Sequence, residues 1–224
     1  LDAIEVMIGS SFDVSNPHDV AVTLIEPRSR SALFSLGREP GVLEAEPFRT
    51  VAVRLRHGAR EERTAITGAP VDGSLSRLVD RHDRPVTPPP GGLVLSSDIA
   101  AKLGVGPGDR VEAQVTEGRR PLLHLPVTAV VDSYVGSGAR MQLEDLNRAL
   151  GEGPQISGAW LVVDSGRTDD LYARLKAAPT VAGVGLQGEA VKRLSELIDE
   201  NLGTAIFTYV GFAGLIAAGV VYNT

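Results

Sequence analysis

The sequence of 224 residues contains no cysteine, so it can form neither disulfides nor thiolate metal sites. Aromatic residues make up only 4% of the chain, and arginine far outnumbers lysine among the basic residues. The formal net charge is −6, and no basic run or basic–aromatic stripe is present. Surfaces that bind nucleic acid carry such a basic footprint, so we expect no nucleic-acid partner.

The motifs that mark common catalytic and cofactor sites are also missing. The sequence has no GxxxxGK[ST] phosphate loop, no HExxH zinc motif and no GxSxG nucleophile elbow. The glycine-rich string at 104–109 reads GVGPGD and precedes a predicted strand rather than a helix, which indicates a tight turn and no dinucleotide site. We therefore expect no catalytic residues, no cofactor and no metal ion, and we expect that the protein is not an enzyme.

A few ionisable residues remain as candidates for chemistry. The histidines lack the i, i+4 spacing of a helix-borne metal pair and are His18, His57, His82 and His124. His82 lies in a polar segment and is expected to be a solvated loop residue. Glu61 and Glu62 are neighbours on a predicted strand and point to opposite faces. Asp169 and Asp170 occupy a first helical turn, where carboxylates are favourable. A Ser-His-Asp site assembled from distant segments stays open on sequence alone.

The sequence contains one long apolar run, near its end. Residues 201–224 carry no charge, and residues 204–222 read TAIFTYVGFAGLIAAGVVY. As a helix these residues would reach about 28 Å, close to the hydrocarbon thickness of a bilayer. Gly214 and Ala218 form a small-xxx-small pair, which lets a second membrane helix approach closely. The run predicts the start of a transmembrane helix at 204–224, and a buried core helix is the alternative.

Amphipathic segments flank the middle of the chain. Residues 1–17 predict an N-terminal stalk helix or an ordinary amphipathic helix, because four apolar residues share one face: Leu1, Ile4, Ile8 and Phe12. Residues 189–203 predict a C-terminal stalk helix that leads into the apolar run. Its stripe consists of Val191, Leu194, Leu197 and Ile198.

A weak internal repeat predicts the fold class. Each copy begins with an apolar, β-rich run, at 20–25 and at 160–163. A polar turn, a short amphipathic helix and a second strand follow, and the second strands begin at Val42 and Val181. The helices should be capped by Ser29 and Thr168 and should pack through Leu33, Leu36, Leu171 and Leu175. Two such units predict an α+β fold with a split, ferredoxin-like βαβ…βαβ subdomain, flanked by stalk helices leading to membrane helices.

The repeat also divides the chain. The predicted parts are an N-terminal stalk helix (1–17), the first half of an α/β subdomain (18–58), an inserted mostly-β subdomain (59–154), the second half of the α/β subdomain (155–188), a C-terminal stalk helix (189–203) and the start of a transmembrane helix (204–224). Within the insert, the sequence predicts strands at 60–67, 93–95, 110–116 and 122–132, and helices at 75–79, 96–103 and 141–150.

Four segments carry a family resemblance. They are PGVLEAEPFRTVAVRL (40–55), GLVLSSDIAAKLGVGPGDRVEAQV (92–115), VTAVVDSY (127–134) and FAGLIAAGVVYNT (212–224). Together they make the chain resemble the extracytoplasmic domain of MacB/FtsX-type ABC transporter permeases, a group that includes macrolide-export-like and lipoprotein-releasing members. The resemblance implies a bacterial inner (plasma) membrane protein, with this fragment on the extracytoplasmic side.

The same resemblance implies a function and a set of partners. ATP-driven motion would pass through the stalk helices to cargo or to periplasmic partners. The implied partners are a cytoplasmic ABC-type ATPase, a second permease copy, and a periplasmic protein or a lipoprotein or other hydrophobic cargo, with membrane contact through the C-terminal helix. A membrane-anchored ligand- or protein-binding sensor ectodomain without transport is the main alternative. A tethered hydrolase is a further one.

Overall fold

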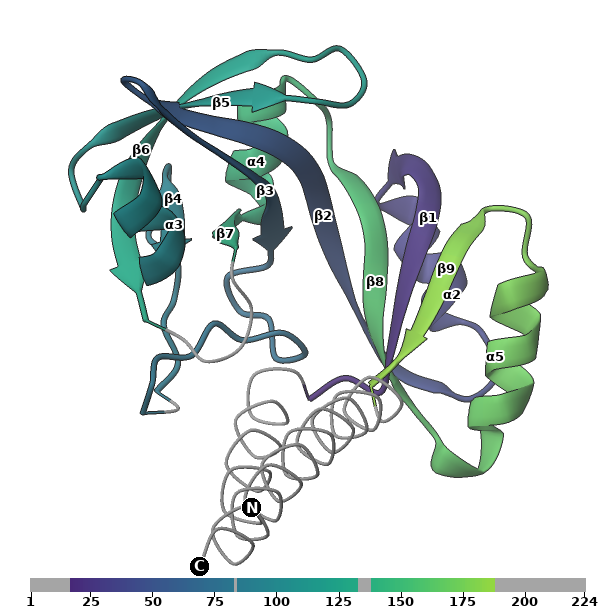
Figure 1. The fold of residues 1–224 in the computed structure, drawn as a ribbon. Helices are drawn as coiled ribbons and strands as arrows, with labels where there is room; N and C mark the ends of the chain where they lie inside the picture. The colour runs from purple at the N-terminus through teal and green to yellow at the C-terminus, as the bar shows by residue number, and fades with distance from the viewer. Residues whose placement is uncertain (1–16, 83, 133–137, 188–224) are drawn as a thin grey trace, which may run out of the picture. The chain divides into compact units, whose positions relative to one another are not determined.

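The two copies of the repeat pair with each other in one antiparallel sheet. The computed structural model describes residues 17–82, 84–132 and 138–187. The first copy forms β1 (Val20–Ser29), α2 (Ser31–Gly37) and β2 (Val42–His57), and the second forms β8 (Gln155–Val163), α5 (Thr168–Ala177) and β9 (Val181–Leu186). The strand order is β2-β8-β1-β9, and all of these neighbours are antiparallel (Figure 1).

The helices α2 and α5 pack on one face of this sheet. Alternate residues of β1 are buried, because successive side chains of a strand point to opposite faces. Val20 and Val22 of β1 join a cluster that also contains Leu36, Leu161, Leu171 and Leu175, with Leu33 packed against it. Segments 20–25 and 160–163 therefore share a sheet, as predicted. The four leucines predicted to pack on one face also lie together: Leu33, Leu36, Leu171 and Leu175.

The strands between β2 and β8 form a closed barrel together with the second half of β2. Its strands are β3 (Arg60–Ala69), β4 (Leu93–Ser96), β5 (Arg110–Val115), β6 (Leu122–Val131), β7 (Ala139–Gln142) and the second half of β2. The pairing runs β2-β3-β7-β4-β6-β5 and returns to β2, so every barrel strand has two neighbours. Two helices, α3 (Ser97–Leu103) and α4 (Leu143–Leu150), contribute Ile99, Leu103 and Leu146 to the barrel core.

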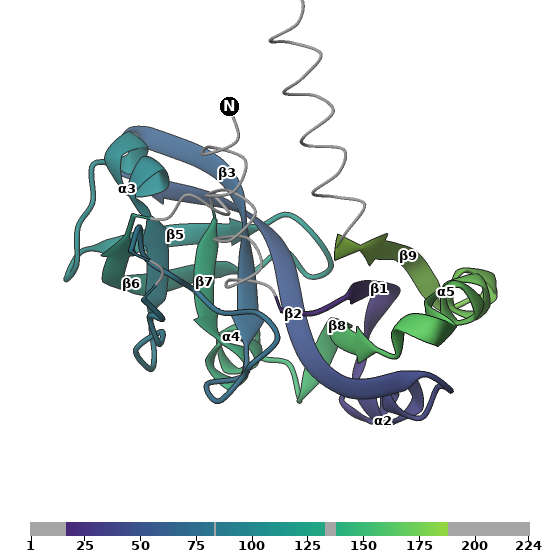
Figure 2. The same ribbon diagram turned by 90° about the horizontal axis from the view of Figure 1, so that it is seen from below.

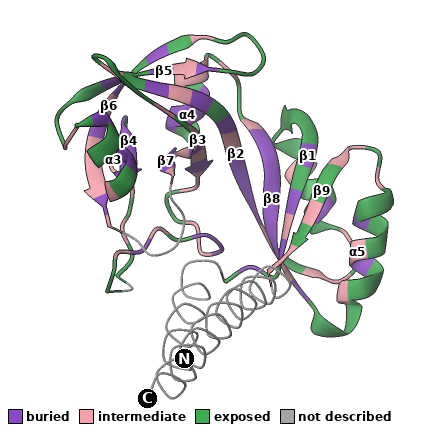
Figure 3. Cartoon of the chain, in the orientation of Figure 1, coloured by how far each residue is buried: buried purple, intermediate pink, exposed green. Residues whose placement is uncertain are grey.

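Strand β2 belongs to both halves of the fold (Figure 2). Between Val42 and Phe48 it pairs with β8, and from Arg49 to His57 it pairs with β3. Its residues Val51, Val53 and Leu55 lie in the barrel core, and buried residues follow one another along β2 and β8 (Figure 3). The domain boundaries at 58/59 and 154/155 stay a prediction. The second half of β2 lies before the first of these boundaries, yet it contributes residues to the barrel core.

Several local expectations are wrong. Residues 75–79 form no helix, because the Glu46 carboxylate accepts the backbone N–H groups of Ser74 and Leu75 and holds the segment in bends. Ser29 Oγ does accept a hydrogen bond from the N–H of Ser31, the first residue of α2, at 3.3 Å, although Arg30 occupies the N-cap position. Thr168 does not cap α5, because it is the first residue of that helix and its Oγ1 donates to Asp164 O and Ser165 O. Just before α5, the Asp164 side chain accepts a hydrogen bond from Gly166 N at 3.1 Å and so caps a single 3₁₀ turn, Ser165–Arg167.

The two ends of the described region are paired with each other in the sheet. Val20, at the start of β1, is paired with Leu186, at the end of β9. The predicted stalk helices and the predicted membrane helix at 204–224 lie outside the described residues, apart from residue 17. Among residues 17–82, 84–132 and 138–187, no helix has the length and the apolar character needed to cross a membrane.

Candidate functional site: the Arg49 junction

Arg49 lies where β2 passes from one partner strand to another. Phe48 is the last β2 residue paired with β8, opposite Gly158, and Arg49 is the first paired with β3, opposite Gly68. The Arg49 side chain is only 3% exposed. Burying a charged group without partners is very costly, so a guanidinium at this depth needs acceptors around it.

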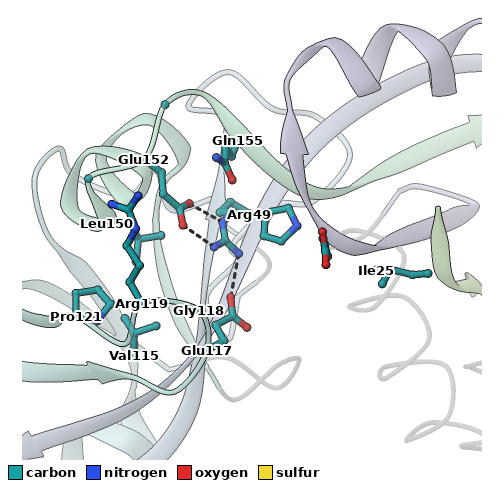
Figure 4. A pocket seen from close by; sticks show the side chains of 14 residues that line it. Ile25, Arg49, Val115, Glu117, Gly118, Arg119, Pro121, Leu150, Glu152 and Gln155 are labelled. Atoms are coloured by element: carbon teal, nitrogen blue, oxygen red, sulfur yellow. Dashed lines mark hydrogen bonds and ion pairs between the residues drawn. The ribbon is translucent and has the colours of Figure 1, made fainter.

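Two glutamates from distant segments supply most of these acceptors (Figure 4). Glu152, in the connection from α4 to β8, accepts two hydrogen bonds, from Nε at 3.1 Å and from Nη2 at 3.2 Å. Glu117, in the turn between β5 and β6, accepts a bond from Nη1 at 3.2 Å. The bidentate geometry with Glu152 adds directional specificity to the charge pairing. Arg49 therefore ties β2 to the start of β8 and to the β5–β6 turn.

Ser157 of β8 completes the arrangement. Its Oγ accepts hydrogen bonds from Arg49 Nη1 at 2.9 Å and from Thr50 N at 3.1 Å, and it donates to Thr50 O at 3.0 Å. Buried backbone groups need partners, and this hydroxyl serves Thr50 where β2 leaves β8. We call Arg49, Glu117, Glu152 and Ser157 the Arg49 junction.

A cavity of about 670 Å³ opens onto the Arg49 junction. Its wall combines the charged groups of the junction with apolar residues from both halves of the fold: Ile25, Pro27, Val115, Pro121 and Leu150 (Figure 4). The volume lies in the range of small-molecule sites, about 300–1,000 Å³. Among the described residues that line it there is no His, Ser, Thr, Tyr or Lys, and two of its three carboxylates are bound to Arg49. The wall therefore offers a bound molecule apolar contacts and a few charged groups.

A second set of buried polar contacts fixes segment 70–79, between β3 and β4, to the four-stranded sheet. Glu46 of β2 is 7% exposed, and its Oε2 accepts from Ser74 N at 2.7 Å and Leu75 N at 3.0 Å. Leu75 also packs with Phe48 and Trp160 on the face of the sheet opposite α2 and α5. The barrel is thus held to the sheet at two places, the Arg49 junction and this anchored segment.

The side chains of His18 and Arg140 complete the anchor. His18 Nδ1 donates to Leu75 O at 2.7 Å, which fixes the tautomer because a carbonyl only accepts. Burial lowers the pKa of His18, with the hydrogen bond to Leu75 and the charge of Asp19 acting in the opposite direction. Arg140 Nη1 donates to Ser76 Oγ at 3.0 Å, and burial lowers the pKa of this guanidinium while the Glu46 carboxylate opposes that shift.

The ionisable residues singled out in the sequence do not come together. His82 is 70% exposed in a loop beside Asp80, as predicted, and His124 is 62% exposed opposite Glu112. Glu61 pairs with Arg54 and Arg56 while Glu62 pairs with Lys102 of α3, so the two carboxylates point to opposite faces as predicted. Asp169 and Asp170 lie in the first turn of α5. Among the residues that the structure describes, no group of three His, Asp or Glu side chains is arranged to hold a metal ion.

Sequence reasoning missed the residues of the Arg49 junction and of the anchor. A usable signal was present in the string EAEPFRTVAV, where Glu46 and Arg49 interrupt an apolar strand. Charged residues are seldom fully buried unless they are paired, so two of them inside a β-run indicate partners elsewhere. The identity of those partners, Glu117 and Glu152, depends on contacts 68 and 103 residues away in sequence.

No protein-family model and no curated protein matches the chain. Among solved structures, the extracellular domain of the noncanonic ABC-type transporter YknZ from Gram-positive bacteria is similar, with 14% identity over 75% of this chain and 98% of that one and a TM-score of 0.46. The periplasmic region of MacB from Actinobacillus actinomycetemcomitans is similar with 13% identity over 83% of this chain and 95% of that one, and a TM-score of 0.48. The chain is thus similar to extracellular and periplasmic domains of the kind that its sequence resembles.

Proposed function

We propose that this chain is the extracytoplasmic domain of an ABC-type permease and that it passes motion from its flanking segments to cargo or to a protein partner. The observation that supports this is the pairing of Val20 with Leu186 in the β1–β9 ladder. Both connections to the flanking segments leave the sheet at one point. This arrangement suits a domain inserted between two neighbouring membrane helices, here the predicted helix at 204–224 and one preceding residue 1.

The sheet offers a route for the motion. A displacement applied where β1 and β9 are paired reaches β8 and then β2 through continuous ladders of hydrogen bonds. Strand β2 carries it into the barrel, and the Arg49 junction resists rotation of the barrel about β2. The strand order β9-β1-β8-β2, with one helix in each half, supports the split, ferredoxin-like interpretation of this sheet.

In this proposal the chain itself does no chemistry. A cytoplasmic ABC-type ATPase supplies the energy, and a second permease copy completes the transporter in the inner membrane. The absence of a phosphate loop from the sequence supports the division of labour. We therefore expect a pure preparation of the 224-residue chain neither to bind nor to hydrolyse ATP. Measurable turnover that follows the protein through purification would contradict this part of the proposal.

The test of coupling alters the C-terminal connection in the intact permease. A flexible Gly-Ser segment inserted between Glu200 and Thr204 should leave folding and membrane insertion intact and should uncouple ATP hydrolysis from the extracytoplasmic activity. The same segment inserted at Gly58, in the exposed β2–β3 turn where no atom lies within 4 Å of an added Cβ, is the matched control and should preserve coupling. Full coupling in both variants would mean that the C-terminal segment is only a tether, as in a sensor ectodomain.

A further inference from the structure

A smaller cavity, of about 240 Å³, lies between β7 and the chain that connects β3 to β4. Residues from two stretches of that connection, 70–78 and 85–88, form most of its wall, and β7 forms the remainder. Hydrogen bonds hold the wall together. Val86 N donates to Leu78 O at 2.7 Å and joins the two stretches, and the Gln142 amide of β7 donates to the second stretch at 2.8 Å. The cavity is therefore shaped by contacts within the fold.

The charged side chains in this wall are of one sign. Arg77 and Arg140 contribute guanidinium groups, and no Asp or Glu is present among the described residues that line the cavity. By contrast, the wall of the cavity at the Arg49 junction includes three carboxylates. The Glu46 carboxylate lies outside this wall, and its Oε2 already accepts two backbone N–H groups. The charge of the wall therefore favours an anion.

Arg140 has unused hydrogen-bond donors at this cavity. Ala139 and Met141 of β7 are buried in the barrel core, so Arg140 points away from that core. Its Nη1 donates at 3.0 Å to Ser76 Oγ, whose residue also lines the cavity. Its Nε and Nη2 make no hydrogen bond to any described residue.

These two nitrogens remain accessible. Three side-chain atoms in the described part of the chain are both fully buried and without a hydrogen-bond partner: Glu46 Oε1, Ser96 Oγ and Asn147 Oδ1. Arg140 Nε and Nη2 also lack a partner but are not among these atoms, so they are not fully buried. They lie along one edge of the guanidinium, and the same two atoms of Arg49 bind both oxygens of Glu152. The free edge of Arg140 therefore has the geometry that a carboxylate needs.

The remaining wall limits the size and polarity of a ligand. Its apolar members come from both stretches and from β7: Pro70, Val71, Pro85, Val86, Pro88 and Met141. The volume is below the range of about 300–1,000 Å³ for drug-sized ligands. It corresponds to about eight water molecules at about 30 Å³ each. A ligand of this size has one charged group and a short apolar part.

From these features we infer that the cavity between β7 and the β3–β4 connection binds a carboxylate that carries a short, branched apolar group. The two carboxylate oxygens accept the N–H groups of Arg140 Nε and Nη2, and Arg77 adds a second positive charge. The branched group packs against the prolines and valines of the wall. This site does not depend on the proposed function, because it is formed by the chain alone.

Other small ligands fit less well. A phosphate ion is polar on all sides and would leave the apolar wall uncovered. A neutral amide of the same shape places an N–H₂ group against a guanidinium, which donates and cannot accept. Two sources share the favoured chemistry, a free short-chain acid and the carboxyl-terminal residue of a peptide.

The test compares an acid with its neutral amide. Isovalerate and isovaleramide are titrated at pH 7 into the isotope-labelled 224-residue chain, and the Nε–H signal of Arg140 is followed by NMR. The acid should bind at least about tenfold more tightly, because hydrogen bonds to a charged acceptor are about twice as strong as neutral ones. Arg140→Gln should reduce this preference to about twofold or less, since only the exposed Arg77 remains.

Arg84→Gln is the matched control. It removes the same charge from a side chain that is 71% exposed and lies outside the wall, so the preference for the acid should stay as it is in the unmodified chain. If Arg140→Gln fails to fold, Arg77→Gln decides, because its side chain is exposed. It should weaken the acid about two- to fivefold and leave the amide unchanged.

Each result decides the inference. Equal binding of acid and amide, or an Arg140 Nε–H signal that does not move at saturation, would overturn it. Tighter binding of inorganic phosphate than of isovalerate would overturn it in favour of a phosphorylated ligand. N-acetylleucine separates the two sources. Its tighter binding than isovalerate would assign the site to a peptide terminus, and weaker binding would assign it to a free acid.

Discussion

The two glutamates that bind Arg49 differ in exposure and in the number of hydrogen bonds they accept. Glu152 is 28% exposed and binds the guanidinium through both of its oxygens, whereas Glu117 is 44% exposed and binds through one. Solvent screens the Glu117 pair more strongly. Losing Glu152 leaves most of a buried cation unpaired, and losing Glu117 does not.

This difference predicts the order of two substitutions. Glu152→Ala should lower the free energy of unfolding by about 3 kcal/mol, at the lower end for breaking a buried pair. Glu117→Ala should cost about 1 kcal/mol or less, as expected for a partly exposed pair. Urea unfolding of each variant measures both, with Arg119→Ala as the exposed control in the same cavity, which should stay within about 0.5 kcal/mol. An equal or larger effect at Glu117 would show that the bidentate pair is not the dominant contact.

His18 predicts a pH dependence of stability. Its pKa is lowered in the folded protein, chiefly by burial, from an ordinary value of 6.5. As the pH falls through that value, the unfolded chain takes up a proton that the folded protein does not, so the unfolded state gains stability. The free energy of unfolding should therefore decrease as the pH falls from about 7.5 to 5.5, and His18→Gln should make this decrease smaller.

The comparison with His124 controls that experiment. His124 is 62% exposed, and His124→Gln gives the effect of replacing an exposed histidine by the same residue. Chemical denaturation at several pH values gives the slopes for all three proteins. Identical slopes for the unmodified chain and His18→Gln would show that His18 contributes nothing to the acid sensitivity.

In the four-stranded sheet, the backbone of β8 at Gly158 lies close to Val22 of β1 and Phe48 of β2. A Cβ at this position would lie 2.7 Å from Phe48 Cζ and would overlap the carbonyl oxygen of Val22. Gly183 of β9 has no atom within 4 Å of an added Cβ. Gly158→Ala should therefore destabilise the protein by about 2 kcal/mol or more, and Gly183→Ala should be nearly neutral. Thermal unfolding compares the two, and similar midpoints would contradict the assigned contact between β8, Val22 and Phe48.

Most elements could be predicted from local sequence. The strands that begin at Val42 and Val181 start at the predicted residues, and the turn at 104–109 uses Gly104 and Gly108 with positive φ, as the glycine-rich string indicates. These elements depend on apolar periodicity and on turn residues that act over a few positions. The pairing of the two halves across more than a hundred residues was predictable only because the repeat made them alike.

The failures have a common physical cause. The helix expected at 75–79 is replaced by bends because Glu46, about thirty residues earlier, binds its backbone N–H groups. The length of β2 was also missed, since nothing local shows that a strand continues from one partner to the next. Closure of the barrel depends on the pairing of β2 with both β3 and β5, which no short segment encodes. Each of these features is decided by long-range partners, and so is the Arg49 junction.

For the whole molecule, the shared strand predicts cooperative unfolding. Strand β2 contributes Val51, Val53 and Leu55 to the barrel core, and its first half pairs with β8 in the four-stranded sheet. If β2 detaches from one half, the core of the other half is exposed as well. We expect one transition in calorimetry, with equal calorimetric and van't Hoff enthalpies.

Substitutions in each core check this expectation. Leu103 lies in the barrel cluster and Leu171 in the cluster beneath α5, and both are fully buried. Leu103→Ala and Leu171→Ala should each lower the free energy of unfolding by about 2–5 kcal/mol and shift the single transition as a whole. Two separated transitions, of which each variant moves only one, would show that the halves are independent.

The position of Val20 opposite Leu186 also bears on how such a unit can be exchanged between proteins. Residues that face each other across an antiparallel ladder have Cα atoms about 5 Å apart. A two-residue hairpin turn bridges that gap. Residues 20–186 therefore form a unit whose two ends are close together. If this unit is removed, a short turn can join the chain that precedes it to the chain that follows it. Its transfer into a surface loop of an unrelated protein would require no widening of that loop.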